Sequence, residues 1–398
     1  MAETLKVFII AGEPSGDKLG GNLMESLKTL TKGQIEFCGV GGEMMQAAGL
    51  KTLFPMSDLT IMGLFEVIPS IPKIKRRITQ TAKAAIDMRP DVLITIDSPD
   101  FCLRVGKKLR AQYPDQFSVH YVAPSVWAWR PERAAKMAKT VNHVLALLPF
   151  EPPYMIAEGM TCDFVGHPAT TEDTPTKAHI KKVLGALDLK PSDEIISVLP
   201  GSRRSEIKRL MPIYLEAIKL ILKDRPQTKF VLPAARPILS ELKSHLSDVT
   251  LPIQILDPTP FTPLEAEHRK RAIYAASRAA LATSGTIALD LAKQRCPMVV
   301  AYKASWLTER AVKRLAQIDR ANLINIATDS YVVPEFLFEK CTTGAVAEAL
   351  LNILNDEQIR DAQVAALSDT MQQLGEGGDP PGLRAAKSVL AAIRKNRQ

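Results

Sequence analysis

The chain of 398 residues has few of the residues that hold metals or disulfides. Its five cysteines are scattered and form no C-x-x-C pair, and its six histidines form neither H-x-x-x-H nor H-E-x-x-H. These absences argue against a zinc site and favour reduced thiols in a cytoplasm, so we expect no metal. The longest apolar runs are roughly ten residues, whereas a membrane-spanning helix needs about 20. The first residues carry no basic region and no cleavage-like site, so we expect no signal peptide.

Two familiar nucleotide-binding motifs are also missing. Gly12-Glu-Pro-Ser-Gly-Asp17 follows an apolar run but is neither a Walker loop nor G-x-G-x-x-G. ATP hydrolysis and NAD binding therefore lose support. The loop would still bring Glu13, Ser15 and Asp17 to the end of a strand; the alternative is a tight turn that caps a helix.

The charge balance is basic, with 51 Lys and Arg against 43 Asp and Glu, a net charge of +8. Such a balance favours an anionic partner, which could be nucleic acid, a phosphorylated substrate or an acidic membrane. The net charge alone does not choose among them.

Short β-type runs alternate with helical stretches in both halves of the chain. This pattern predicts an α/β fold with two Rossmann-like domains whose parallel sheets face a shared cleft. Sequences rich in Pro, Thr and Gly at 166–175 and 375–382 predict domains 1–170 and 171–375, and a final helix in 376–398 that packs on the first domain or on a partner subunit. The predicted strands are 6–11, 35–40, 92–96, 118–122, 143–147 and 163–165, then 195–199, 229–232, 253–256, 279–282 and 297–301, and the predicted helices include 18–30, 73–88 and 132–138.

Two loops of the second half have the composition of phosphate sites. In Pro200-Gly-Ser-Arg-Arg-Ser-Glu206, Gly201 permits close approach of a ligand, Ser202 could cap the helix, and Arg203 could bind a diphosphate. In the second loop, Ser284, Gly285 and Thr286 offer hydroxyls and N–H groups, and Asp290 could accept hydrogen bonds from a ribose. The alternatives are a βα turn with solvated arginines and a capped helix with no ligand.

Carboxylates in the first half are candidates for acid–base chemistry. Asp97 and Asp100 follow the strand predicted at 92–96, where either could be a general base for a hydroxyl nucleophile. The alternative for each is a helix N-cap. The loop 123–131 contains Trp127 and Trp129, which either bind a ligand or anchor the loop in the core.

The apolar segment 61–71 and the basic residues after it have the composition of an interfacial membrane anchor. The alternative is a buried loop and helix start. The residues predicted to contact the membrane are Leu64, Phe65, Val67, Ile68, Lys73, Lys75, Arg76 and Arg77.

These motifs occur together in one order, and in that order the chain resembles bacterial lipid-A-disaccharide synthase from about residue 5 to about residue 340. The resemblance implies an inverting glycosyltransferase of the GT-B type that needs no metal or other cofactor. Its substrates would be UDP-2,3-diacylglucosamine and 2,3-diacylglucosamine 1-phosphate (lipid X), joined through a β-1,6 linkage at the inner face of the inner membrane. The motifs are Gly12-Glu-Pro-Ser-Gly-Asp17, Gly39-Val-Gly-Gly42, Asp97-Ser-Pro-Asp-Phe101, Pro124-Ser-Val-Trp-Ala-Trp-Arg130, Leu148-Pro-Phe-Glu151, Phe164-Val-Gly-His-Pro168, Leu199-Pro-Gly-Ser-Arg203 and Ser284-Gly-Thr286.

The resemblance also implies roles for single residues. Arg203 and 284–286 match UDP-binding motifs of the family, Asn322 matches a motif close to the nucleotide, and Asp97 matches a carboxylate required for activity. The family usually has Glu where Asp290 stands. A homodimer is a further possibility.

Two alternatives remain at this stage. A UDP-N-acetylglucosamine 2-epimerase or another soluble UDP-sugar enzyme would have the same fold, but it would not need the apolar segment 61–71. A basic nucleic-acid-binding protein would explain the net charge, but the sequence contains no recognised nucleic-acid module. We therefore expect no nucleic-acid partner.

Overall fold

The computed structural model describes residues 4–59, 64–306, 309–310, 314 and 320–398, without the side chains of 64–70. The chain forms two compact units: unit 1 comprises residues 1–168 and 377–398, and unit 2 comprises 169–376. The predicted boundaries at 170 and 375 lie within two residues of these divisions. Within the described residues, no helix is long and apolar enough to cross a membrane.

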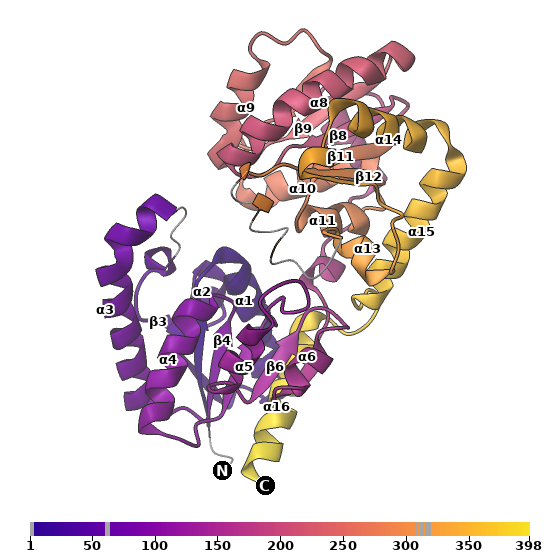
Figure 1. Cartoon of the computed structure of the whole chain (residues 1–398). Helices are drawn as coiled ribbons and strands as arrows, with labels where there is room; N and C mark the ends of the chain where they lie inside the picture. The colour runs from indigo at the N-terminus through magenta and orange to yellow at the C-terminus, as the bar shows by residue number, and fades with distance from the viewer. Residues whose placement is uncertain (1–3, 60–63, 307–308, 311–313, 315–319) are drawn as a thin grey trace. The chain divides into compact units, whose positions relative to one another are not determined.

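Unit 1 is built around a parallel sheet with helices on both faces (Figure 1). The sheet order is β3-β2-β1-β4-β5-β6-β7, so the order of strands reverses between β1 and β4. The strands are β1 (Leu5–Ala11), β2 (Ile35–Val40), β3 (Lys51–Thr52), β4 (Val92–Ile96), β5 (Ser118–Tyr121), β6 (His143–Ala146) and β7 (Thr161–Phe164). The helices are α1 (Pro14–Leu30), α2 (Glu43–Ala47), α3 (Leu64–Met88), α4 (Pro99–Gln112), α5 (Glu132–Ala138), α6 (Pro152–Ile156) and α16 (Pro381–Arg397).

Alternate side chains of β1 enter two different core layers. Val7 and Ile9 pack with side chains of α1 and α16, whereas Phe8 and Ile10 pack with side chains of α3 and α4. Both faces are therefore dry, which explains why the strands read as continuous apolar runs.

The C-terminal helix α16 returns to unit 1 and packs on α1. Gly382 makes this approach possible, since a Cβ there would lie 2.9 Å from the carbonyl oxygen of Asn22. The Arg384 guanidinium donates to the Phe164 carbonyl (2.9 Å), and the Ser388 hydroxyl donates to Asp163 (2.7 Å). These contacts fix the helix beside β7, the edge strand of the unit 1 sheet.

Unit 2 repeats the architecture with the sheet order β10-β9-β8-β11-β12-β13. Its order reverses between β8 and β11, which pair in parallel. The strands are β8 (Ile195–Leu199), β9 (Lys229–Pro233), β10 (Ile253–Leu256), β11 (Ala279–Thr283), β12 (Met298–Tyr302) and β13 (Glu335–Leu337). Among the described residues, the α-helices of unit 2 are α7 (Lys177–Gly185), which precedes β8, and then α8 (Arg204–Asp224), α9 (Leu239–Leu246), α10 (Pro263–Ala276), α11 (Ile287–Lys293), α13 (Leu323–Ala327), α14 (Thr343–Asn355) and α15 (Glu357–Gln373).

The helix predicted at 73–88 begins nine residues earlier, at Leu64, so the predicted start was wrong. Pro69 and Pro72 suggested a break, because proline removes a helix hydrogen bond. However, Ile74 and Ile78, further along the helix, pack on the core of unit 1, and their burial stabilises the helix despite the prolines.

Candidate functional site

The β8–α8 loop of unit 2 is shaped by Gly201 and Glu206. Gly201 has φ +118°, and a Cβ there would lie 2.3 Å from Glu206 Oε2, so both the angle and the space require glycine. Glu206 Oε2 accepts hydrogen bonds from the backbone N–H groups of Ser202 (3.0 Å) and Arg203 (3.2 Å). The N-cap is Arg203 and not Ser202, so the capping role predicted for Ser202 was wrong.

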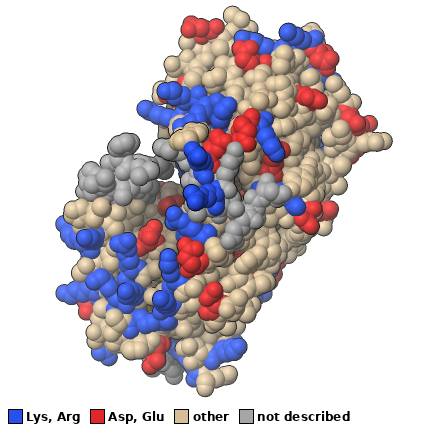
Figure 2. Space-filling model, viewed as in Figure 1, with Lys and Arg blue, Asp and Glu red and all other residues tan. Residues whose placement is uncertain are grey.

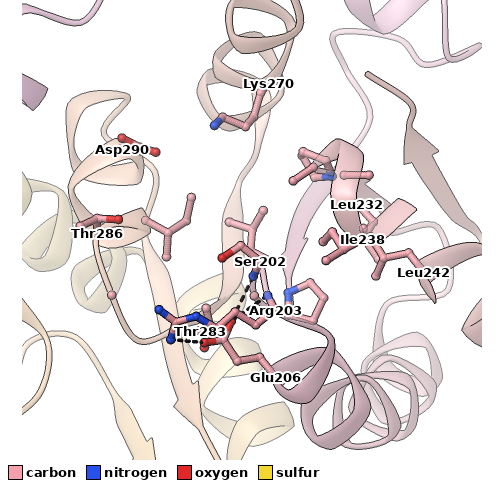
Figure 3. Close-up of a pocket in the computed structure, with 18 of the residues that line it drawn as sticks. Ser202, Arg203, Glu206, Leu232, Ile238, Leu242, Lys270, Thr283, Thr286 and Asp290 are labelled. Atoms are coloured by element: carbon pink, nitrogen blue, oxygen red, sulfur yellow. Dashed lines mark hydrogen bonds and ion pairs between the residues drawn. The ribbon is translucent and has the colours of Figure 1, made fainter. Parts of the chain in front are cut away.

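The Arg203 side chain is an exposed cation of this loop that lines a pocket. It is 79% exposed, and its ion pair with Glu206 is 3.5 Å long. Figure 3 shows this pair at the edge of a pocket of about 490 Å³. Since a long, exposed ion pair contributes little, the guanidinium is available to an incoming anion.

The β11–α11 loop forms another wall of the same pocket. Ser284, Gly285 and Thr286 line it, and Gly285 has φ +142°, with no described group within 4 Å of the place that a Cβ would occupy. Thr283, which sequence reasoning missed, is buried and its hydroxyl has no hydrogen-bond partner among the described residues. A buried hydroxyl normally has a partner, so Thr283 offers a binding group to a ligand in this pocket.

Asp290 lies on α11 and lines the pocket too. Burial raises the pKa of its carboxyl, the nearby charges of Glu267 and Glu172 raise it further, and Lys270 and Arg271 oppose them. Figure 3 shows Thr286 and Asp290 on one side of the pocket and Leu232, Ile238 and Leu242 on the other. The pocket therefore combines hydroxyls and a cation with an apolar wall.

The remaining predicted residue of unit 2, Asn322, is not among the described residues that line this pocket. It caps α13, where its Oδ1 accepts from the Ile324 N–H (2.8 Å). Its amide nitrogen is buried without a hydrogen-bond partner among the described residues.

In unit 1, the ends of β1 and β4 meet at the point where the strand order reverses. A Cβ on Gly12 would lie 2.6 Å from the Ser98 hydroxyl, so the two loops are in close contact. Asp97 and Ser98 have φ of +48° and +42°, a left-handed conformation that non-glycine residues seldom adopt. Partial desolvation and the negative charge of Asp97 raise the pKa of Glu13. The loops thus concentrate negative charge at the edge of the sheet.

A second pocket, of about 570 Å³, lies at these strand ends. Glu13, Asp97 and Asp100 contribute its carboxylates, and Ile74 and Ile78 from α3 contribute part of its apolar wall. Ser15 is exposed on α1 and is not among the described residues that line this pocket. Such a pocket suits a ligand with a polar group that reacts beside a carboxylate base and an apolar group that packs on the apolar wall.

Asp17 does not join this cluster, although its loop position suggested that it would. Its carboxylate is buried and accepts from the N–H groups of Gly42 (2.8 Å), Met44 (3.0 Å) and Met45 (3.1 Å). A carboxylate satisfied by three N–H groups at the start of α2 has a structural role.

The two tryptophans of the 123–131 loop differ in environment. Trp127 packs edge-on against Phe150, with ring centroids 5.2 Å apart, and donates to Glu151 (3.4 Å). Glu151 also accepts from the Leu148 N–H (3.0 Å), and burial raises its pKa to about 7. Trp127 therefore anchors the loop, whereas Trp129 is exposed.

The predicted membrane residues divide into three groups. The side chains of Leu64, Phe65, Val67 and Ile68 lie outside the described residues. Lys73 and Arg77 form ion pairs with Asp58, and the Arg77 guanidinium lies 4.3 Å from the Phe54 ring centroid. Lys75 and Arg76 are exposed.

Within the described residues there is no group of three or more His, Cys, Asp and Glu that could hold a metal ion.

Comparisons with known proteins agree on one family. The family model described as lipid-A-disaccharide synthetase matches residues 7–379. A lipid-A-disaccharide synthase from Ruegeria pomeroyi is 48% identical over 386 residues, covering 97% of this chain and 95% of the relative. One from Rhodospirillum centenum is 40% identical over 393 residues, covering 98% and 95%.

Similarity to solved structures gives the fold. A UDP-GlcNAc 2-epimerase from Neisseria meningitidis bound to UDP-GlcNAc superposes with a TM-score of 0.60 at 14% identity, covering 98% of this chain and 99% of that one. A UDP-forming trehalose-phosphate synthase from Burkholderia xenovorans gives a TM-score of 0.56 at 13% identity, with 100% of both chains covered. At such identities these structures share only the fold with this chain. The chain belongs to the lipid-A-disaccharide synthase family, and it is a glycosyltransferase with the GT-B fold.

Proposed function

We propose that the chain transfers the 2,3-diacylglucosaminyl group of UDP-2,3-diacylglucosamine to the 6-hydroxyl of lipid X. The products are UDP and a β-1,6-linked disaccharide 1-phosphate. The observation that supports this most is the contrast between the two pockets. One combines hydroxyls with the exposed guanidinium of Arg203, and the other combines three carboxylates with an apolar wall and with the cations Lys75 and Arg104.

The unit 2 pocket is the proposed donor site. The Arg203 guanidinium binds the diphosphate as a fork, and Ser284 and Thr286 donate to phosphate oxygens. Asp290 accepts from the ribose hydroxyls, and Thr283 gains the partner that it lacks. The N–H groups of Ser202 and Arg203 already bind Glu206, so the guanidinium carries more of the diphosphate contact than the loop backbone does.

In the reaction, Asp97 is the proposed general base. Its carboxylate takes the proton of the acceptor 6-hydroxyl while that oxygen attacks C1 of the donor sugar. The bond from C1 to the phosphate oxygen breaks with its electron pair, and UDP leaves from the opposite face, which inverts the configuration. Arg203 stabilises the negative charge that develops on the leaving diphosphate. Asp100 and then Glu13 are the alternative bases.

Both substrates carry acyl chains, so we place the enzyme on the inner face of the inner membrane. Segment 61–71 is the proposed apolar contact, and the exposed cations Lys75 and Arg76 are the proposed contacts with anionic headgroups. Lys73 and Arg77 contribute less, because Asp58 already neutralises part of their charge.

The test is an assay with UDP-2,3-diacylglucosamine and lipid X in detergent, without added metal, read by mass spectrometry. We expect the disaccharide 1-phosphate and UDP in equal amounts. Failure to form the disaccharide would reject the proposal. Conversion of UDP-N-acetylglucosamine to its 2-epimer would instead favour the epimerase alternative, for which the solved structures offer only a shared fold.

A further inference from the structure

A third pocket, of about 660 Å³, lies within unit 1 between α4 and α5, and we call it the α4–α5 pocket. It is distinct from the pocket of Asp97, although the two are neighbours. Figure 2 shows Lys and Arg side chains gathered over the part of unit 1 in which Figure 1 draws α4. The cations that line the pocket are Arg104, Lys107, Arg130, Arg133, Lys136 and Lys139.

The charge of these cations is not neutralised by the protein. None of the six forms an ion pair with an acidic side chain of the described residues, in contrast to Lys73 and Arg77. Asp100 and Glu132 are the acidic side chains that line the pocket, which leaves an excess of four positive charges. Gathered like charges repel one another, and a bound anion relieves that repulsion.

Trp129 orients two of the cations. Its ring is 38% exposed, and the guanidinium carbons of Arg130 and Arg133 lie 4.6 Å and 5.8 Å from its centroid. Stacking on an aromatic ring restricts an arginine and leaves its N–H groups free to donate. Such a pair matches the geometry of a phosphate group better than flexible lysines alone do.

The pocket adjoins the site of the proposed base. Pro99, Asp100 and Arg104 line both the α4–α5 pocket and the pocket that contains Asp97. An anion held between α4 and α5 therefore lies beside the molecule that Asp97 would deprotonate. In a glucosamine 1-phosphate, the phosphate and the 6-hydroxyl extend from the two carbons that flank the ring oxygen, so one sugar presents both groups to neighbouring sites.

We propose that the α4–α5 pocket binds the phosphate monoester of the acceptor and so makes the enzyme select a phosphorylated acceptor. This inference rests on the proposed function. A phosphate monoester carries about two negative charges near pH 7, which suits a pocket with several unpaired cations. Arg130 and Arg133 bind the phosphate oxygens, and Lys107 and Arg104 add charge from α4.

The test compares two acceptors, 2,3-diacylglucosamine 1-phosphate and the same molecule without its phosphate, dispersed in detergent. The variants are Arg130→Ala/Arg133→Ala and Lys107→Ala. The matched control is Lys108→Ala, which removes the neighbouring exposed cation of α4 that does not line the pocket. Circular dichroism and UDP affinity report whether each variant is folded.

We expect kcat/KM for the phosphorylated acceptor to fall about 100-fold or more in the double variant and about 10-fold in Lys107→Ala, mainly through KM. Turnover of the acceptor without phosphate, UDP affinity and the Lys108→Ala control should change less than threefold. The ratio of kcat/KM for the two acceptors should therefore fall in the pocket variants alone.

Four results would overturn this inference. An equal loss with both acceptors would mean that the cations have a structural role. A retained preference for the phosphorylated acceptor, with weaker binding to phosphatidylglycerol vesicles, would mean that the pocket binds membrane headgroups instead. If the enzyme without substitutions turned over neither acceptor, both the proposed function and this inference would fail. If it turned over the acceptor and the variants kept the same preference for the phosphorylated one, only this inference would fail.

Discussion

Replacement of Arg203 by alanine in the proposed donor pocket should weaken UDP binding and leave the stability of the fold almost unchanged. The side chain is 79% exposed, and its only ion pair among the described residues is the 3.5 Å pair with Glu206. Exposed pairs of this length contribute roughly 0–1 kcal/mol to stability. The Glu206 carboxylate keeps its two backbone donors after the change, because both belong to the main chain. We therefore expect the melting temperature to change little.

The effect on UDP should be much larger than the effect on folding. A hydrogen bond between charged groups contributes about 1.5–3 kcal/mol, and about 1.4 kcal/mol corresponds to a factor of ten in affinity. The loss of one guanidinium from a diphosphate should thus weaken UDP binding about 10- to 100-fold. The upper end applies if both arms of the guanidinium bind the diphosphate.

Isothermal calorimetry with UDP measures this change, and thermal unfolding checks the fold. Arg204→Ala is a matched control, since Arg204 is the adjacent exposed arginine and does not line the pocket. UDP affinity that stayed within twofold for Arg203→Ala would refute the assignment of Arg203 to the diphosphate. Equal weakening in both variants would point to a long-range effect of net charge.

Four further changes test other parts of the structure. Asp97→Asn should lower kcat by at least about 100-fold while UDP affinity in calorimetry is kept, and if Asp100→Asn is the inactive variant instead, the base is Asp100. Gly201→Ala should lower stability by about 1–3 kcal/mol in denaturant unfolding, because φ is +118° and the new Cβ would collide with Glu206; an unchanged midpoint would contradict this. Burial raises the pKa of Glu151 from 4.5 to about 7, so the folded state holds that proton more tightly than the unfolded state does. The free energy of unfolding should therefore fall by up to about 3 kcal/mol as the pH rises from 4.5 through 7. Glu151→Gln should abolish this decline, and an equal decline with pH in the variant and the unchanged protein would refute the prediction. A variant with serine in place of Leu64, Phe65, Val67 and Ile68 should lose more of its liposome binding than of its turnover of detergent-dispersed substrate. Unfolding of this variant would instead show that these side chains belong to the core.

The sheets could be predicted because their strands are buried on both faces. Residues of β1 and β8 read as continuous apolar runs, and each strand enters two core layers. The strands β3 and β13 were missed, since they have two and three residues and lack such a run. The start of α3 was placed nine residues too late, because the prolines hid an apolar face that is stabilised by tertiary packing.

The loops of the candidate site could be predicted from glycines at strand ends, but the directions of their side chains could not. Arg203 and Asp290 line one pocket as expected, whereas Asp17 turns to the start of α2 and Asn322 caps α13. Thr283 was overlooked because a threonine at the end of a buried strand looks like core. Its missing hydrogen-bond partner becomes visible only in three dimensions.

The two units use the same backbone arrangement but place different side chains at the ends of their strands. In each sheet the strand order reverses between two neighbours, and the loops after those strands lie side by side. In unit 2 these loops place a guanidinium and hydroxyls around a pocket, which suits an anionic leaving group. In unit 1 they place Glu13 and Asp97 together, and the pKa of Glu13 is raised mainly by burial and further by the negative charge of Asp97. Residue type at the strand ends, rather than the fold, is therefore the reason why we propose unit 2 for the nucleotide and unit 1 for the base.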